Sequence, residues 1–379
     1  MSESPGQWPE DVAIRFYAES SVSLPGMGDQ PESCGAYYPS KFCTDCGNPH
    51  FEQSTCETRT CPFCWSAWRR RRAEQITVRL GSARAAADPG LDKRAVHVVG
   101  SPPTGSIKSL VDIQRGYRET YELARAKGIR GGVAIFHGFR VTDAAKDAYD
   151  AAVESGDWLP ERDGKLWRWV RQQDASWRDL TYWSPHYHLI GLARDVGWSD
   201  ADEQEGWILR RIRSLDRFSP NIDSGYKDMI GLSMYLLSHA TFETTASKHS
   251  IRWFGELSTN QFSPESELDA GLYDLIATRA RELAGTAQGT ESDTGGSGPT
   301  DEQSGCRTEG CSGEFAPIWE AGAALSDPRF CDSIASETES LLNAAFQWAI
   351  GDRPPPDDQL FPKTRTEARE ILRELAAGT

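Results

Sequence analysis

The chain has 379 residues, enough for two or three domains, and its 56 acidic and 41 basic residues give a formal net charge of −15. Only 38% of the residues are hydrophobic, and the absence of any run of eighteen apolar residues excludes a membrane span and predicts a soluble globular protein. The first residues lack a basic stretch followed by an apolar one, so we expect no secretion signal and a cytoplasmic location.

The basic residues are mostly arginine, with 32 Arg against nine Lys. An acidic, lysine-poor chain is typical of a protein that works in molar salt, where the Debye length is about 3 Å. Only basic side chains in direct contact with a ligand then contribute to binding it. Arginine suits this role because its guanidinium group can bind two phosphate oxygens at once. The negative charge therefore does not exclude a nucleic-acid partner, and the alternative is an ordinary acidic enzyme.

The N-terminal part divides by composition. Residues 1–33 are acidic, with several Gly and Pro, and predict a flexible tail. Residues 34–90 predict a zinc-binding module followed by an arginine-rich helix over 65–84 that ends near Gly81. The candidates for contacts with nucleic acid lie on this helix: Arg69, Arg70, Arg71 and Arg72.

Two C-x2-C pairs carry the zinc prediction. Cys43 and Cys46 form one pair, and Cys61 and Cys64 form the other. Two such pairs close a tetrahedral Zn²⁺ site, and because four thiolates leave no open position, the site is expected to be structural and to hold the arginine-rich helix against nucleic acid.

Other cysteines leave alternatives open. Cys34, Cys56 and His50 are surplus and could each replace one zinc ligand. A second group holds only three cysteines, so a second zinc there would need a ligand from elsewhere; its members are Cys306, Cys311 and Cys331.

Residues 91–262 alternate between strand and helix patterns. Strands are predicted over 93–105, 131–142, 184–193 and 251–258, and helices over 106–128, 143–155, 199–215 and 226–241, with Ser106 and Thr142 as N-caps. This order predicts an α+β sandwich with a small appendage on each side. Residues 285–305 lack large apolar side chains and predict a flexible linker, and 306–379 predict a Cys-containing helical region with a helix over 366–377.

One predicted strand carries two histidines. Alternation along a strand places His186 and His188 on the same face, a few ångströms apart. With a third ligand they would bind a divalent metal and leave positions open, whereas the alternative is a pair of buried core histidines. His137, on a neighbouring predicted strand, is the candidate third ligand, and His97 is its rival.

The segment 228–240 of the helix predicted over 226–241 carries Tyr235, with His239 one turn later on the same face. A tyrosine hydroxyl is a poor nucleophile at neutral pH because its pKa is near 10. It becomes effective where a metal polarises the phosphate that it attacks.

Together, the segments HVVGSPP, SPHYHLIG and YLLSHA resemble, in order, the three motifs of HUH-superfamily endonucleases, and most of all the rolling-circle replication initiators of haloarchaeal plasmids and viruses. The segment STCETRTCPFCWSAWRRRRA is similar to the zinc segment before the same nuclease in single-strand transposases. The resemblance covers roughly residues 40–260.

The resemblance implies an antiparallel sheet flanked by helices, with a ferredoxin-like or RRM-like nuclease core over 91–262. His186 and His188 would hold Mg²⁺ or Mn²⁺, and Tyr235 would nick single-stranded origin DNA, leaving a 5′-phosphotyrosine and a free 3′-OH. Relatives supply a carboxylate or amide as third ligand, where this chain offers His137.

Several alternatives stay open from sequence. The same chemistry is found in single-strand transposases, which act on element ends. A zinc-module regulator with structural histidines would bind DNA without cleaving it. Residues 306–379 are a candidate docking region for host replication proteins such as a helicase.

Overall fold

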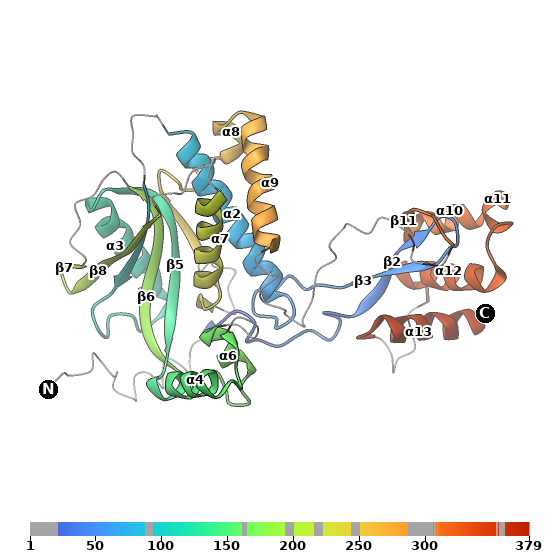
Figure 1. Ribbon diagram of the computed structural model, residues 1–379, viewed down its shortest axis with the longest axis horizontal. Coiled ribbons are helices and arrows are strands. Elements are labelled where there is room, and N and C mark those ends of the chain that lie inside the picture. The colour runs from blue at the N-terminus through green and yellow to red at the C-terminus, as the bar shows by residue number, and fades with distance from the viewer. Residues whose placement is uncertain are drawn as a thin grey trace. The chain divides into compact units, whose positions relative to one another are not determined.

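A computed structural model gives the fold (Figure 1). It divides the chain into two compact units: unit 1 comprises Met1–Gly28 and Thr58–Asp293, and unit 2 comprises Asp29–Glu57 and Thr294–Thr379. No helix in the described part of the chain is long and apolar enough to cross a membrane. The structure describes residues 22–87, 94–160, 165–193, 201–215, 223–243, 251–286, 306, 308, 310–353, 355 and 361–378.

Unit 1 is built around a six-stranded sheet in which every pairing is antiparallel, in the order β10-β5-β6-β4-β8-β7. β6 therefore lies inside the sheet, between β5 and β4. The predicted α+β class, with an antiparallel sheet flanked by helices, is confirmed (Figure 1). The strands are β4 (Arg94–Ser101), β5 (Ile129–Val141), β6 (Thr181–Ala193), β7 (Ala201–Gln204), β8 (Trp207–Leu215) and β10 (Ile251–Gly255).

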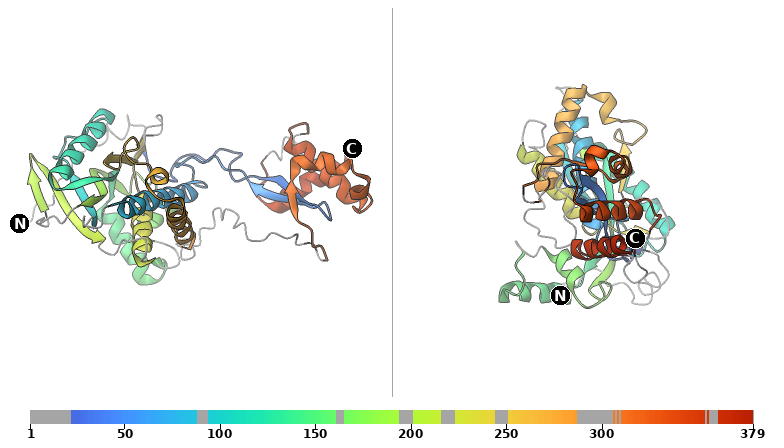
Figure 2. Two further views of the ribbon diagram at one scale, coloured as in Figure 1. Left: turned by 90° about the horizontal axis from the view of Figure 1, so that it is seen from above. Right: turned by 90° about the vertical axis from the view of Figure 1, so that its right-hand side faces the viewer.

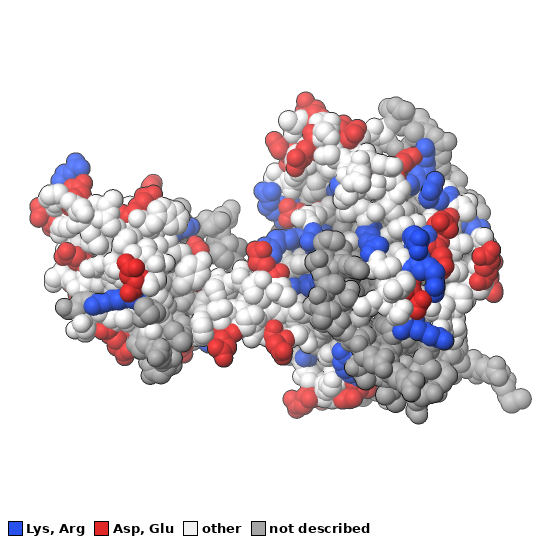
Figure 3. All heavy atoms as spheres, turned by 180° about the vertical axis from the view of Figure 1, so that it is seen from behind, with Lys and Arg blue, Asp and Glu red and all other residues white. Residues whose placement is uncertain are grey.

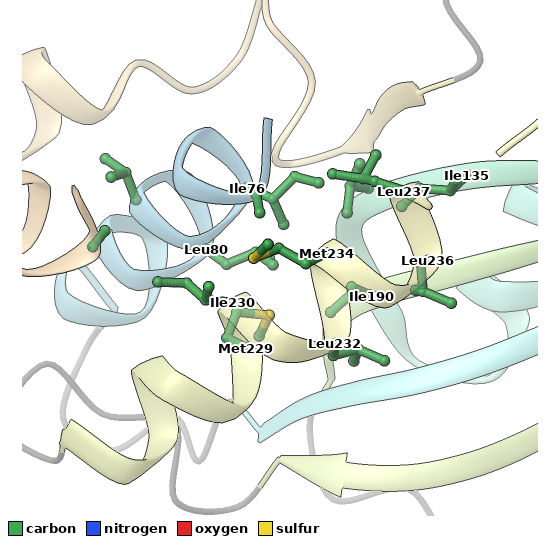
Figure 4. Close-up of a cluster of buried hydrophobic side chains, with 14 of the residues drawn as sticks. Ile76, Leu80, Ile135, Ile190, Met229, Ile230, Leu232, Met234, Leu236 and Leu237 are labelled. Atoms are coloured by element: carbon green, nitrogen blue, oxygen red, sulfur yellow. The ribbon is translucent and has the colours of Figure 1, made fainter. Parts of the chain in front are cut away.

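Three helices cover one face of this sheet, which we call face 1. They are α2 (Trp65–Ala85), α7 (Asp223–Leu237) and α9 (Ala270–Thr286). Figure 4 shows Ile76 and Leu80 of α2 and Met234 of α7 in the same buried cluster as residues of β5 and β6. Burial of apolar area of this kind contributes about 25 cal/mol per Å² and fixes the helices on the sheet.

The opposite face, face 2, is covered by α3 (Leu110–Ala126). Tyr117 of α3 packs against Phe136 and Tyr187 from the sheet, and Tyr187 Oη donates a hydrogen bond of 3.0 Å to the carbonyl of Ile113. Odd and even positions of β5 and β6 thus alternate between two buried faces.

Of the two N-caps predicted from the sequence, one is present and the other is not. Thr142 caps α4 (Asp143–Ser155) by accepting from the N–H of Ala145, as predicted. The cap of α3 is Ser109, which accepts from Asp112, and not the predicted Ser106. α6 (Leu166–Gln172) lies between α4 and β6 along the chain.

The helix predicted over 199–215 is wrong. The described residues of this stretch form a β-hairpin of β7 and β8, turned at Glu205 and Gly206, both of which have positive φ. Trp207 and Leu209 are buried while Ile208 is exposed, which is the alternation of a strand. A two-residue turn of this kind matches the twist of the strands that it joins.

Two smaller features complete unit 1. β1 (Val22–Ser23) pairs with β9 (Phe242–Glu243), and Leu24 is fully buried, so residues 22–25 of the predicted 1–33 tail are packed, whereas 29–33 are exposed. α8 (Pro264–Glu267) precedes α9, a helix that the sequence analysis did not predict. Residues 1–21 of the predicted tail lie outside the described residues, as do 287–305 of the predicted linker.

Unit 2 combines two distant parts of the sequence. Its sheet has the order β11-β2-β3, from β2 (Tyr37–Cys43), β3 (Pro49–Gln53) and β11 (Phe315–Pro317). Figure 2 shows β2 and β3 beside the C-terminal helices, and Phe42 and Phe51 share a core with Leu342 and Leu372. The helical elements are η1 (Ile318–Glu320), α10 (Ala321–Leu325), α11 (Pro328–Cys331), α12 (Ser336–Ala349) and α13 (Arg365–Ala377).

This division differs from the predicted one. The segment 34–90, predicted to be one zinc module, contributes β2 and β3 to unit 2 and α2 to unit 1. The helix predicted over 366–377 is present as α13, which a capping box of Thr364 and Glu367 begins.

Candidate metal centres

Three histidines meet on face 1. His137 of β5 is the cross-strand partner of His186 of β6, and His188 follows two positions along β6. A ring nitrogen of each lies within 4.8 Å of the others, so the group could hold a metal ion. The structure thus brings together the two histidines of the sequence motif and the expected third one.

Hydrogen bonds fix which nitrogen of two of these rings is available. His186 Nδ1 lies 2.7 Å from the carbonyl of Ser184, and His137 Nε2 lies 2.9 Å from the carbonyl of Leu236. A carbonyl only accepts, so both of these nitrogens carry the hydrogen. The free lone pairs are therefore on His186 Nε2 and His137 Nδ1.

His137 Nδ1 is buried and has no hydrogen-bond partner among the described residues. A buried lone pair left in this way is costly unless a partner satisfies it. A metal ion bound by the three rings would be that partner, so the residues present fit a divalent cation.

His97, the rival candidate for the third ligand, lies outside the three-histidine group and contacts His188. Its Nε2 is 2.8 Å from Nδ1 of His188, and the two rings stack. With Nδ1 of His188 in this bond, Nε2 is left to bind the metal. His97 therefore takes the position of an outer partner that orients a metal-ligating ring.

The protonation state suits metal binding. Burial, together with the smaller effect of the Arg140 charge, lowers the pKa of His186 to about 4. Burial also holds the pKa of His137 and of His188 well below 6.5. The imidazoles are therefore neutral at physiological pH, which is the form that binds a metal. Three protein ligands leave positions open for water or a substrate.

Tyr235 lies near this group, on α7. It is 51% exposed, and the next residue, Leu236, supplies the carbonyl that accepts from His137. Partial burial raises the pKa of Tyr235, so the hydroxyl keeps its proton at neutral pH.

His239 links the tyrosine to the histidine group. Its ring centroid lies 5.0 Å from that of Tyr235 and 4.1 Å from that of His137. It stacks on Trp167 at 4.8 Å with an interplanar angle of 9°. The sequence placed His239 beside Tyr235 by helical spacing but gave no sign that it touches the strand histidines.

Two side chains that the sequence analysis missed lie at the exposed end of β5 and β6. Arg140 and Tyr182 are cross-strand partners, three and four residues from His137 and His186. Arg140 is exposed, and Tyr182 is 37% exposed. The charge of Arg140 acts on the pKa of both His186 and His188, which places a cation beside the group.

The predicted nucleic-acid contacts on α2 are wrong in part. Arg69 is only 5% exposed, with its guanidinium 4.6 Å from the ring centroid of Trp65, so it packs inside the protein. Arg72 donates to Gln75, and Arg71 is exposed. Figure 3 shows Lys and Arg side chains on the same face of unit 1 as Asp and Glu. Trp167 and Trp169 of α6 and Trp183 of β6 are buried in the core.

The predicted set of four zinc ligands is also wrong. Cys43 and Cys46 group with Cys306 and Cys311. The other predicted pair, Cys61 and Cys64, is not part of this group. The four sulfur atoms of the group lie within 4.8 Å of one another and could hold a metal ion.

The pairing of β11 with β2 explains this grouping, because it places Phe315 opposite Cys43 and so brings the preceding turn to the β2–β3 turn. Cys331 lies outside the group, and its Sγ contacts the carbonyl of Leu325.

Comparisons with protein-family models, with curated proteins and with solved structures found no match. The candidate function therefore rests on the geometry of the chain itself.

Proposed function

We propose that unit 1 is a metal-dependent endonuclease of the HUH type, which nicks and joins single-stranded DNA through Tyr235 as a rolling-circle replication initiator. One observation carries the proposal: the group of His137, His186 and His188 lies under the end of α7 that bears a half-exposed tyrosine. The order of the motifs along the chain agrees with it.

The residues that would hold Mg²⁺ or Mn²⁺ are His137 through Nδ1 and His186 and His188 through Nε2. When bound, such an ion neutralises charge on a non-bridging phosphate oxygen and orients the phosphate for in-line attack. The neutral state of the three rings supports this assignment.

Tyr235 supplies the nucleophile. Its Oη forms a bond to phosphorus while the bond from phosphorus to the 3′ oxygen breaks. The phenolic proton leaves to solvent, and the departing oxygen takes up a proton to become a 3′-OH. The product is a 5′-phosphotyrosine, whose ester bond lets a later 3′-OH attack and rejoin the strand without a nucleotide cofactor.

Arg140 and Tyr182 support a single-stranded substrate. An exposed arginine beside the histidine group can pair a phosphate oxygen, and an exposed tyrosine ring offers a surface on which an unpaired base can stack. Bases inside a duplex are stacked on one another and present no free face to such a ring.

The test is formation of a covalent adduct. The protein is incubated in high salt and Mn²⁺ with a single-stranded origin oligonucleotide labelled at its 3′ end, and the products are separated under denaturing conditions. We expect labelled DNA attached to the wild-type protein, no adduct with Tyr235→Phe, and unchanged DNA affinity. Tyr226→Phe is the matched control, since Tyr226 lies on the same helix but is buried, and it should keep the adduct.

Four results would contradict the proposal. An adduct with Tyr235→Phe would show that another residue is the nucleophile. Unchanged cleavage by the double variant His186→Ala and His188→Ala would remove the metal role. Binding without any cleavage by the wild type would favour a DNA-binding regulator. Adduct formation with transposon ends but not with the origin would favour a transposase.

A further inference from the structure

We propose that Cys43, Cys46, Cys306 and Cys311 bind one Zn²⁺, which links the β2–β3 hairpin to the C-terminal part of unit 2. The site joins two segments of the chain that lie 268 residues apart at Cys43 and Cys311. It differs from the site expected from the two C-x2-C pairs, and it does not depend on the proposed nuclease activity.

The sulfur distances fit a shared ion. Cys43 Sγ lies 3.4 Å from Cys311 Sγ, and Cys46 Sγ lies 3.5 Å from Cys306 Sγ. A disulfide would need about 2.05 Å. Four thiolates at the usual zinc–sulfur bond length of about 2.3 Å lie about 3.8 Å from one another in a tetrahedron. The observed distances are close to this spacing.

The backbone of the β2–β3 turn is shaped to present two sulfurs. Gly47 has a φ of +69° and donates its N–H to the carbonyl of Cys43 at 2.8 Å. This left-handed position, which glycine adopts without strain, turns the chain directly after Cys46.

The turn that precedes β11 lies close to Cys43. The N–H of Cys311 donates to the carbonyl of Thr308 at 2.9 Å, and β11 begins four residues later at Phe315. A Cβ on Gly313 would lie 2.5 Å from Cys43 Sγ, so the backbone of this turn approaches the sulfur too closely for any side chain at that position.

Polar neighbours are placed to support thiolates. The Asn48 side-chain amide lies 3.5 Å from Cys46 Sγ and 2.9 Å from the hydroxyl of Thr308. The Thr308 hydroxyl is itself 3.2 Å from Cys306 Sγ. Hydrogen bonds of this kind stabilise ligating sulfurs and orient them.

The ligand set points to zinc in a structural role. Four sulfur ligands in a tetrahedron are typical of zinc, and they leave no position for a substrate. Unit 2 is small, with a core formed by two short segments of the chain, and small units commonly need a metal or covalent link to be stable. The ion would hold the β2–β3 hairpin to the C-terminal part.

Elemental analysis of purified full-length variants tests the site. We expect Cys46→Ser and Cys306→Ser each to contain one zinc equivalent per chain less than the wild type. The double variant should lose the same single equivalent, because both residues hold one ion. Cys331→Ser is the matched control, since Cys331 lies in the same unit but outside the group, and it should keep the wild-type zinc content.

A ligand exchange separates loss of the site from loss of the fold. Cys306→His keeps a ligand that zinc accepts, so it should retain the equivalent that Cys306→Ser loses. The proposal is overturned if Cys306→Ser keeps the wild-type zinc content, if Cys306→His loses zinc as Cys306→Ser does, or if the lost metal is iron. A double variant that loses twice as much zinc as either single variant would show two separate sites.

Discussion

The Nε2–H of His137 donates a hydrogen bond of 2.9 Å to the main-chain carbonyl of Leu236, the residue after Tyr235. One ring thus contacts the candidate catalytic helix with one nitrogen and offers the other to the metal group. The position of the tyrosine is therefore coupled to the candidate metal ligands through the side chain of His137, in addition to the ring contacts of His239.

His97 should control metal affinity from outside the ligand group. His97→Leu removes the hydrogen bond to His188 and puts an apolar side chain of similar size in the buried position. Because His188 loses the contact that orients it, we expect Mn²⁺ affinity to fall about 10–100-fold. Titration calorimetry measures it. His50→Leu, a change in unit 2, should leave the affinity as it is. Equal affinities for the wild type and His97→Leu would show that His188 is oriented by other contacts.

Arg140 should contribute one phosphate contact. We expect Arg140→Ala to weaken binding of single-stranded DNA uniformly across sequences and to reduce the slope of log K against log salt by about 1. Fluorescence anisotropy over a salt series measures both. Arg130→Ala is a control on the same strand, because Arg130 is paired with Glu256 at 2.5 Å. A salt slope that is the same in both variants would argue against a contact by Arg140.

Tyr182 should act through its ring and not through its hydroxyl. Tyr182→Ala is expected to cost about 1–3 kcal/mol in binding of single-stranded DNA, the usual value for loss of one stacked base, whereas Tyr182→Phe should bind as the wild type does. Binding of the same oligonucleotide to the three proteins compares them. A loss of affinity in Tyr182→Phe equal to that in Tyr182→Ala would point to a hydrogen bond instead.

The packing of α2 on α7 should depend on Gly81. A Cβ at this position would lie 2.6 Å from the hydroxyl oxygen of Tyr226, so Gly81→Ala is expected to destabilise the protein by about 1–3 kcal/mol. Adding Tyr226→Phe removes that oxygen and should recover part of the loss. Denaturant unfolding followed by circular dichroism measures the free energy of unfolding.

Gly231 of α7 offers the opposite case for comparison. No described atom lies within 4 Å of a Cβ built there, so Gly231→Ala should stabilise the helix by about 0.5–1 kcal/mol. If both alanine variants changed the stability in the same direction, the close approach of Gly81 to Tyr226 would not be the cause.

The histidine group could be predicted because the signal is local. Alternation along one strand places His186 and His188 on the same side, and the apolar residues around His137 identify a second strand of the sheet. His97 was a rival for the same reason. Which of the two joins the group depends on the strand order and register, which no local pattern specifies.

Other features depend on contacts between distant residues. The four-cysteine group of Cys43 and Cys311 follows from the pairing of β2 with β11, and spacing alone favoured the nearer cysteines. Gly81 suggested the end of a helix, but α2 continues to Ala85, and the glycine leaves room for the Tyr226 hydroxyl. The sequence predicts a helix in place of the β7–β8 hairpin because the turn at Glu205 and Gly206 is only two residues long and interrupts the pattern little.

The pairing of β2 with β11 also sets an order of events during synthesis. At about 5–20 residues per second, the 268 residues between Cys43 and Cys311 delay the meeting of these strands by on the order of ten seconds to a minute. The ribosome completes the long segment of unit 1 within that interval. During this interval the β2–β3 hairpin lacks its partner strand β11. Its cysteines therefore stay exposed to competing ions and oxidants until Cys311 has been translated.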